Sequence, residues 1–470
     1  MKVTRLSAQD VHGYLKLEVE FNSDLTFLTG LNGSGKTSAL KLLVALLTPS
    51  PEEFAATSFS SAQVSVMEGA SEVTIAANKT NDGITLRIDT VDHPLVLSSS
   101  DLQFMIDSRR REEHRGAREE AFSPIQEKIV KHPVYCAIRD LSTPMFLGLD
   151  RRLLGPGWLR EDAGETRRRD FMMRRMLRDD EMIRGSTIDA GLADVNYLVL
   201  EKMQEIRAAQ ERLDERLRQK FFTRAFEYKP SDYSTGNKLP SREELERYRK
   251  SLTTIERAAE GLRLPVPELK SALSDFLERM TVVVKSLEES AKKSAGKKGS
   301  RKGGSSELLP EKFDDNFLEW IINKPQSDRI LEHLALLDGY VSSRRELHGP
   351  IDKFVNLINS FLDQTRKRVA VADSGELEVW LDGSPAARPI TALSSGERQL
   401  LIMLGHLSLN HNLEKSAVFI VDEPELSLHV AWQERFVDAM IEANPSVQYI
   451  LATHSPAIIL DRVESCWSMS

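Results

Sequence analysis

A glycine-rich segment near the start of the chain constrains its fold more than any other feature. Residues 30–37 read Gly-Leu-Asn-Gly-Ser-Gly-Lys-Thr and match the phosphate-binding pattern G-x-x-x-x-G-K-[ST] at every fixed position. A strand pattern precedes this loop, and apolar residues at helical spacing follow it from Thr37 to Leu47. A loop between a strand and a helix N-terminus directs backbone N–H groups at phosphate oxygens. The sequence therefore predicts an α/β fold with a nucleotide site at this loop.

Two side chains of the loop have the chemistry that a nucleotide site needs. We expect Lys36 to reach the β- and γ-phosphates of ATP and the Thr37 hydroxyl to ligate Mg²⁺. The alternative is a chance glycine-rich turn between a strand and a helix. The residues predicted to bind ATP are Gly30, Asn32, Gly33, Ser34, Gly35, Lys36, Thr37 and Ser38.

A second motif lies near the other end of the chain. Residues 417–421 form a continuous apolar run, typical of a strand buried on both faces, and Asp422 and Glu423 follow it. A carboxylate at the end of a buried strand is costly without a partner, and Mg²⁺ is the natural partner for Asp422. We predict that Glu423 polarises the attacking water. An acidic turn after a core strand is the structural alternative.

Two further turns accompany these motifs. The Ser/Gly turn at 393–399 leads into an apolar helix and is a second candidate anion site. After a predicted helix at 431–444, a second apolar strand at 447–453 ends at His454. We predict that His454 contacts the γ-phosphate, while an ordinary turn histidine is the alternative.

Together, the phosphate loop, LSSGERQ at 393–399, IVDEPELSLH at 420–429 and ATHSP at 452–456 resemble the ABC-type ATPase head, in its SMC-like and OLD-like form. The resemblance implies a mixed sheet with flanking helices, an antiparallel β meander and ATP hydrolysis with Mg²⁺. It also implies that two heads enclose ATP between them. Ser394, Gly396 and Glu397 would then contact the nucleotide bound to the other subunit.

The same resemblance assigns catalytic roles and shows one departure. His454 matches the switch histidine, which would act with Glu423 in catalysis. Ser395 replaces the first glycine of the transporter form of the signature turn, as is common among SMC-like proteins. Gln103 is a candidate for the Q-loop glutamine, and its part in Mg²⁺ coordination stays open.

The motifs occupy only the two ends of the chain, which predicts a head divided by an insertion. We expect residues 1–155 and 366–470 to form the head and 156–365 to form a helical, partly coiled-coil insertion with a flexible basic tether at 291–306. Strands are expected at 2–30, 58–97, 134–149 and 368–381. Helices at 199–217 and from 241 would fold back as a hairpin or belong to an ordinary helical bundle.

The length of the insertion bears on function. A short arm with DEPELSLH resembles the stand-alone ATPases of prokaryotic antiviral systems, such as PtuA of Septu and AriA of PARIS. This resemblance implies a nucleotide-gated sensor or scaffold that holds a separate nuclease or toxin effector and responds to a phage protein. The alternative is an SMC-like DNA repair or recombination ATPase that binds duplex DNA. A third reading is the motor subunit of a transporter.

Composition restricts the location and the partners. The chain has 470 residues and a formal net charge of −8, which argues against a generally basic nucleic-acid coat. Two cysteines are too few for a disulfide framework, and no signal peptide or membrane-spanning run is evident, so we expect a cytoplasmic protein without a membrane partner. Arginine clusters at 109–118 and 167–175 are either solvated helix faces or a docking surface for DNA or an acidic protein.

Overall fold

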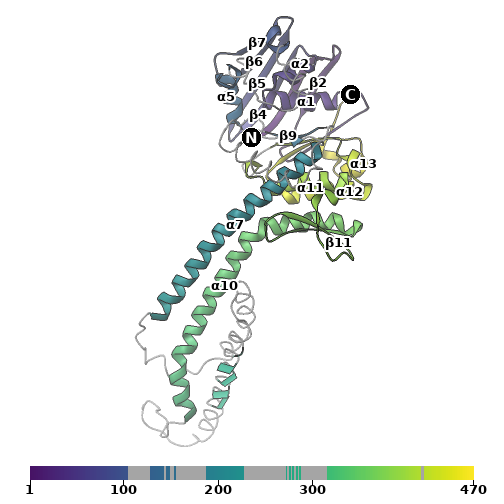
Figure 1. The fold of residues 1–470 in the computed structure, drawn as a ribbon. Helices are drawn as coiled ribbons and strands as arrows, with labels where there is room; N and C mark the ends of the chain where they lie inside the picture. Colours follow the sequence, from purple (N-terminus) through teal and green to yellow (C-terminus); the bar gives the residue numbers. More distant parts are fainter. Residues whose placement is uncertain are drawn as a thin grey trace, which may run out of the picture. The chain divides into compact units, whose positions relative to one another are not determined.

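The computed structural model describes residues 1–103, 128–141, 144–148, 153–154, 187–226, 315–413 and 418–469, with short helical turns between 271 and 286. The chain divides into two compact units (Figure 1). One contains Met1–Lys202 and Ile351–Ser470 and holds the β-sheets, and the other contains Met203–Pro350 and is helical. Within the described ranges, no helix has the length and apolar character needed to cross a membrane.

An antiparallel sheet of six strands forms the N-terminal layer of the first unit, in the order β2-β1-β4-β5-β6-β7. Its strands alternate between buried and exposed residues, as in β5, where Val73, Ile75 and Ala77 are buried. A tight turn joins β5 to β6, which pair as a hairpin up to Thr80 and Gly83. The strands are β1 (Lys2–Val11), β2 (Leu15–Glu20), β4 (Ser61–Glu68), β5 (Ser71–Thr80), β6 (Gly83–Ile88) and β7 (Leu95–Ser98).

A second six-stranded sheet positions the motifs of both chain ends. Its order is β15-β3-β14-β13-β8-β9, and all neighbouring pairs are parallel except β8 and β9. Every residue of β13 and β14 is buried, as expected for central strands of a covered sheet. Because the strands are parallel, β3, β13 and β14 end at the same edge. The strands are β3 (Leu25–Thr29), β8 (Met145–Leu147), β9 (Leu153–Leu154), β13 (Val418–Asp422), β14 (Gln448–Ala452) and β15 (Cys466–Ser468).

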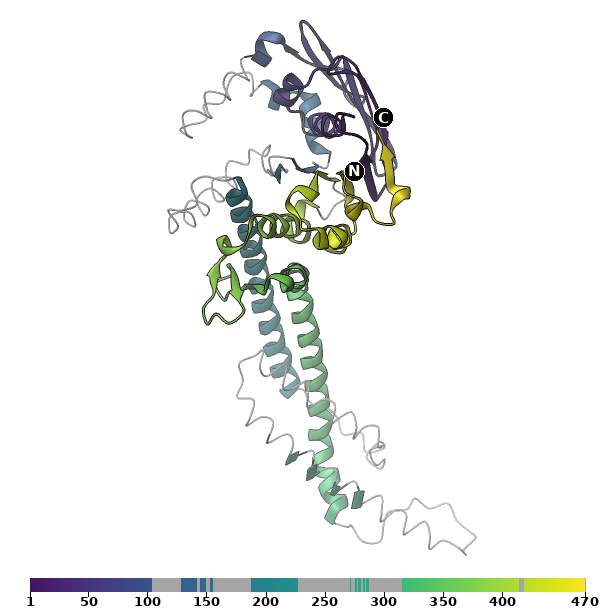
Figure 2. The same cartoon turned by 90° about the vertical axis from the view of Figure 1, so that its right-hand side faces the viewer.

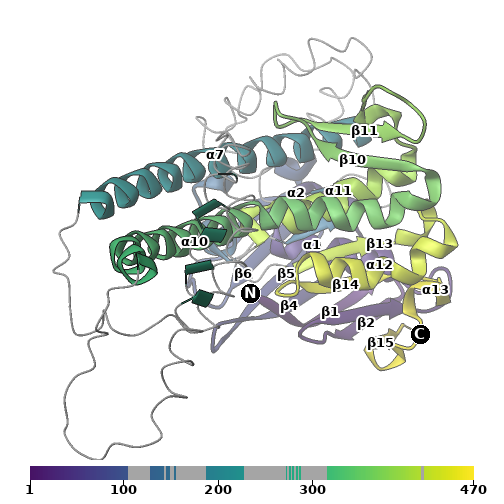
Figure 3. The same ribbon diagram turned by 90° about the horizontal axis from the view of Figure 1, so that it is seen from below.

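Helices and a small third sheet complete the first unit. Helix α12 (Val430–Ala443) lies beside β13 and β14 (Figure 3). The Tyr449 hydroxyl of β14 donates to the Met440 carbonyl of this helix at 2.6 Å, which fixes the helix on the parallel sheet. The helices are α1 (Lys36–Leu47), α2 (Pro51–Ala56), α5 (Pro133–Asp140), α11 (Ser395–Leu409), α12 (Val430–Ala443) and α13 (Pro456–Ile459). The third sheet has the order β10-β11-β12, with β10 (Lys367–Val371), β11 (Leu377–Leu381) and β12 (Arg388–Pro389). The 3₁₀ turns are η2 (Asp363–Thr365), η3 (Ile390–Ala392), η4 (His411–Leu413), η5 (Pro424–Ser427) and η6 (Val463–Ser465).

Two long helices, α7 (Thr187–Phe226) and α10 (Asp315–Leu362), build the second unit and extend into the first. Within the second unit they lie side by side (Figure 2). The Tyr340 hydroxyl donates to Asp214 Oδ1 at 2.7 Å, and the rings of Phe221 and His333 stack with centroids 4.6 Å apart. The described partner of α7 is therefore α10. The predicted helix from residue 241 lies outside the described residues.

The predicted α/β class, with an antiparallel meander and a helical insertion, is confirmed, but one predicted strand is wrong. Residues 134–138 lie in helix α5 instead. His132 caps this helix, since its Nδ1 accepts a hydrogen bond from Val134 N at 3.2 Å, and Pro133 occupies the first turn. Val134 and Ile138 are buried at helical spacing. The basic tether at 291–306 and the arginine clusters at 109–118 and 167–175 lie outside the described residues.

Candidate nucleotide-binding site

The phosphate loop links β3 to α1 and needs glycine at three places. Gly30, Gly33 and Gly35 have φ values of 146°, 86° and 91°, a region that side-chain-bearing residues rarely adopt. A Cβ on Gly30 would also collide with the carbonyl oxygen of Met469. On Gly35 it would lie 3.1 Å from Leu17 Cδ2. The predicted loop thus has the backbone freedom that close approach to phosphate requires.

Lys36 begins α1 and folds back over the loop. Its Nζ donates to the carbonyl oxygens of Gly30 at 3.0 Å and Leu31 at 3.2 Å, and the residue is 5% exposed. Burial lowers the pKa of Lys36, while the nearby carboxylates of Glu423 and Asp422 oppose that shift. The ammonium group therefore lies between the loop and the acidic end of β13, where a phosphate group can compete for it.

Thr37 and Asp422 bring the two ends of the chain together. The Thr37 hydroxyl donates to Asp422 Oδ1 at 3.3 Å, and Asp422 is 4% exposed. Burial raises the pKa of Asp422 to about 6, although the hydrogen bond from Thr37 opposes this shift. Within the described residues, the buried Asp422 Oδ2 has no hydrogen-bond partner. One free carboxylate oxygen beside a hydroxyl fits Mg²⁺, which proteins usually bind through one or two carboxylates together with phosphates and water.

Glu423 follows Asp422 in a left-handed conformation, with φ of 48°. Its N–H donates to the carbonyl of Ala452 on β14 at 2.9 Å, which fixes the turn after β13. Its charge raises the pKa of Asp422, so the two carboxylates interact electrostatically. The predicted general base is therefore adjacent to the predicted metal ligand at the edge of the sheet.

Glu425 is a residue of this site whose part sequence reasoning missed. Its carboxylate accepts hydrogen bonds from Thr453 Oγ1 at 2.9 Å and from the N–H of His454 at 2.7 Å. Gln433 of α12 extends the network, because its Oε1 accepts from Ser455 Oγ at 2.6 Å. The spacing of Glu425 from Asp422 in DEPE was the available signal, but nothing in the sequence shows which backbone groups it holds.

His454 lies at the end of β14, as predicted, and its side chain is exposed. It lines an open cavity of about 360 Å³ together with Gly30, Thr29 and Thr453. Because Gly30 begins the phosphate loop, this shared cavity places His454 on the same side of the sheet edge as the loop.

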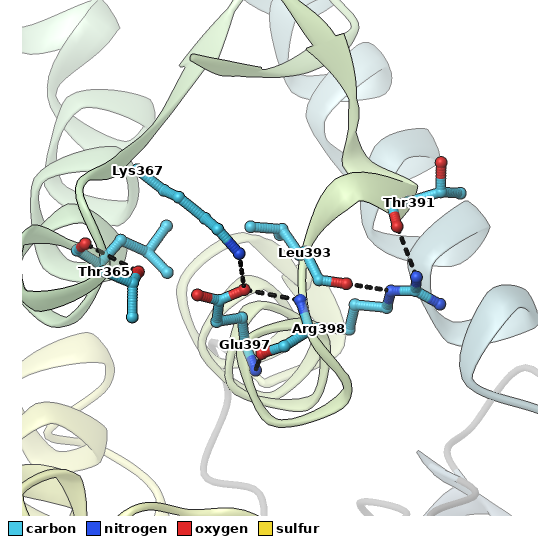
Figure 4. A network of polar contacts seen from close by, with 8 residues as sticks. Thr365, Lys367, Thr391, Leu393, Glu397 and Arg398 are labelled. Atoms are coloured by element: carbon cyan, nitrogen blue, oxygen red, sulfur yellow. Dashed lines mark hydrogen bonds and ion pairs between the residues drawn. The ribbon is translucent and has the colours of Figure 1, made fainter. Parts of the chain in front are cut away.

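The signature turn caps helix α11. The Ser394 hydroxyl accepts from the N–H of Glu397 at 3.4 Å, and Glu397 Oε2 accepts from the N–H of Ser394 at 2.6 Å, forming a capping box. Ser394 is exposed and Gly396 half-buried, whereas Glu397 is 1% exposed and paired with Lys367 (Figure 4). The predicted contact of Glu397 with ATP on another subunit stays a prediction. Within the chain, the carboxylate holds the backbone of the turn that begins α11.

Exposure and contacts differ among the other residues that the sequence predicts for this site. Ser38 Oγ lies 2.8 Å from Nε2 of His12, a residue of the turn between β1 and β2 that sequence reasoning missed. Asn32 is exposed, and the buried Ser34 hydroxyl has no hydrogen-bond partner in the described part of the chain. Gln103 is exposed in the helical turn after β7, where the described stretch 1–103 ends, so its Q-loop role stays a prediction.

Comparisons with known proteins agree with a nucleotide site. A family model described as AAA ATPase domain matches residues 1–459. The chain is similar to the Retron Ec83 probable ATPase of Escherichia coli, with 24% identity over 160 residues, and to the Retron Vc95 probable ATPase of Vibrio cholerae, with 27% identity over 118 residues. These matches cover 32% and 23% of this chain, but only 28% and 22% of the two relatives.

Among solved structures, the Smc head domain of Pyrococcus furiosus with an extended coiled coil, bound to the C-terminal domain of ScpA, aligns with 97% of this chain and 91% of its own. The identity is 13% and the TM-score 0.38. The Smc head domain of Pyrococcus yayanosii, with a coiled coil and joint, aligns with 97% of this chain and 93% of its own at 14% identity and a TM-score of 0.33.

Proposed function

The chain belongs to the AAA ATPase domain family, and from this premise we propose that it binds ATP with Mg²⁺ and hydrolyses it. The observation that carries the proposal is the contact between Thr37 and Asp422 beside Lys36. Those three side chains supply a cation for phosphate and two oxygen ligands for a metal, at the mouth of a glycine-rich loop.

Each residue then has a defined task. Lys36 exchanges the carbonyl oxygens of Gly30 and Leu31 for phosphate oxygens. Thr37 and Asp422 would hold Mg²⁺, which neutralises phosphate charge when it is bound. Glu423, fixed by its bond to Ala452, orients water for attack, and His454 contacts the γ-phosphate.

We further propose that hydrolysis requires two copies of the chain. In this arrangement Ser394 of the partner subunit and Gly396 of the partner subunit complete the site around ATP. The exposed N-terminus of α11 supports the proposal, because a capped helix start with small residues can approach a phosphate closely. Residues 1–155 and 366–470 would form each head, divided by the insertion at 156–365.

The biological role that we propose is antiviral defence. The protein would act in the cytoplasm as a sensor or scaffold that holds a nuclease or toxin effector and releases it on contact with a phage protein. Support comes from the short arm with DEPELSLH, which resembles PtuA and AriA, and from the similarity to two probable ATPases of retrons. A DNA repair ATPase is the competing function.

Two variants test the ATPase proposal. Lys36→Ala should abolish ATP binding, measured by equilibrium binding of a fluorescent ATP analogue. Glu423→Gln should retain binding, lose hydrolysis by a factor of about 10² or more, and accumulate an ATP-dependent dimer in analytical ultracentrifugation. Normal phosphate release by both variants would refute the assigned site.

A pull-down tests the defence role. Tagged Glu423→Gln protein, expressed from its native operon, should co-purify with a stoichiometric nuclease-like or toxin-like protein, identified by mass spectrometry. Absence of any such protein, together with ATP turnover that duplex DNA stimulates in a salt-dependent manner, would instead establish the repair function.

A further inference from the structure

A buried ion pair underlies the signature turn. Lys367 Nζ of β10 lies 2.7 Å from Glu397 Oε2, and the Glu397 side chain is almost fully buried. Burial alone would raise the pKa of Glu397, but hydrogen bonds from Lys367, the Ser394 backbone and Thr365 hold it below its usual value. Removal of Lys367 would leave a buried charge without its cation, which proteins tolerate poorly. The position of Glu397 therefore depends on Lys367.

Glu397 in turn determines the geometry of the residues before it. Its carboxylate accepts the N–H of Ser394, while Ser394 caps the N–H of Glu397. Arg398 closes the same turn by donating Nε to the Leu393 carbonyl at 2.7 Å and a guanidinium nitrogen to the Thr391 carbonyl (Figure 4). A shift of Glu397 would accordingly displace Ser394 and Gly396 at the start of α11.

The strand that carries Lys367 is tied to the last turns of α10. Asn359 of α10 makes two hydrogen bonds with Val369 of β10, donating Nδ2 to its carbonyl at 2.9 Å and accepting its N–H at 2.7 Å. Between the two elements, Thr365 Oγ1 donates to the Leu362 carbonyl at 3.0 Å, and Arg366 turns the chain with φ of 54°. Displacement of these helix turns would thus move Lys367.

The first turns of α7 contact the same signature helix. A Cβ on Gly405 of α11 would lie 2.6 Å from Val195 Cγ1, and a Cβ on Gly191 of α7 would lie 2.8 Å from Ile402 Cδ1. The glycines thereby allow close packing of α7 on α11. Helix α7 therefore packs directly on α11, and the end of α10 is linked to α11 through β10 and the Lys367–Glu397 pair.

We propose that Lys367 is a positioning residue for the contact between the signature turn and ATP on the other subunit. It holds Ser394 and Gly396 in place through Glu397, and it connects them to the end of α10. The insertion can therefore control assembly of the two heads without contact with the phosphate loop. This inference rests on the proposed function and adds its regulation.

The experiment is done in the Glu423→Gln background, where ATP should hold the dimer. Lys367→Met should weaken ATP-dependent dimerisation by about tenfold in sedimentation velocity. Binding of the fluorescent ATP analogue to the monomer at low protein concentration should stay within about twofold, because Lys36 and Thr37 are unaltered. Lys367→Arg should recover most of the dimerisation, since it keeps the cation. Lys16→Met is the matched control, because it removes a lysine from the exposed pair of Lys16 and Glu18.

The outcomes separate the possibilities. If the Lys367→Met variant dimerised as strongly as the Lys16→Met control, the inference would be overturned. If Lys367→Met lost both ATP-analogue binding by the monomer and thermal stability, the inference would also be overturned, because Lys367 would then have only a structural role. Asn359→Ala should reproduce the dimerisation defect, and normal dimerisation of this variant would disprove the link to α10. Failure of Glu423→Gln itself to dimerise would overturn the proposed two-headed function.

Discussion

Thr37 donates its hydroxyl to Asp422 Oδ1 at 3.3 Å, across a separation of 385 residues in the sequence. The contact exists because β3 and β13 belong to one parallel sheet, with only β14 between them. Asp422 at the end of β13 and Thr37 in the helix that follows β3 therefore lie at the same edge of the sheet. The site is an outcome of sheet topology, and it forms only when both ends of the chain have joined this sheet.

The Thr37 hydroxyl should be needed for the metal rather than for the fold. Thr37→Val keeps the shape of the side chain but removes the ligand, so we expect hydrolysis to fall by about 10² and the Mg²⁺ concentration for half-maximal activity to rise. Thr37→Ser retains the hydroxyl and is the control. Titration of activity with Mg²⁺ checks this expectation, and equal Mg²⁺ requirements for the valine and serine variants would contradict it.

Asp422 should destabilise the protein in the absence of MgATP. Burial raises its folded pKa from 3.8 to about 6, so folding favours the protonated form. The resulting cost in unfolding free energy is absent below about pH 4, grows between about pH 4 and 6, and stays at about 3 kcal/mol above that. We expect the melting temperature of Asp422→Asn to exceed that of wild type at pH 8 but not at pH 4. Calorimetry without nucleotide measures these melting temperatures. A difference between Asp422→Asn and wild type that shrinks as pH rises would contradict the expectation. MgATP should stabilise only the wild type.

Glu425 should act on catalysis through its two hydrogen bonds to Thr453 and His454. Glu425→Gln retains one acceptor oxygen, so we expect turnover to decrease by about tenfold or more while KM for ATP changes little. The matched control is Glu442→Gln, at an exposed position of α12. Steady-state kinetics measure the effect, and a large rise in KM at constant turnover would exclude this positioning role.

Gly30 should be much less replaceable than a positive-φ glycine that has open space around it. Gly30→Ala would direct a Cβ at the Met469 carbonyl, whereas Gly69, with φ of 63°, has open space around it. Gly69→Ala should cost about 1 kcal/mol in unfolding free energy from backbone strain, and Gly30→Ala several times more. Thermal unfolding without nucleotide compares the two variants. Equal losses would show that the loop is free to move away from Met469.

Much of the first unit could be predicted from sequence because its signals are local. Alternation predicted the N-terminal strands, and the loop pattern predicted the start of α1 to within one residue, at Lys36 instead of Thr37. The error at 134–138 has a clear cause. A run of five partly apolar residues fits a strand or a helix equally well, and the decisive signals, the cap of His132 and Pro133, lie just outside the run.

The long-range parts of the site could not be predicted. Nothing in the sequence pairs Lys367 with Glu397 or Glu425 with the His454 backbone, because these contacts depend on how separate elements pack. The contact of α7 with α10 could not be predicted for the same reason. Apolar spacing indicates which face of a helix is buried, but it does not say which other helix covers that face.

The pairing of β3 has a consequence for biosynthesis. Its two neighbours, β14 and β15, are the last two strands that the structure describes, so the strand that leads into the phosphate loop leaves the ribosome before either partner has been made. A chain truncated before residue 448 would contain the whole GLNGSGKT loop but neither of the two strands that pair with β3. The complete site, in which Thr37 contacts Asp422 and β3 is paired on both edges, therefore forms only after residues 418–468 have been translated.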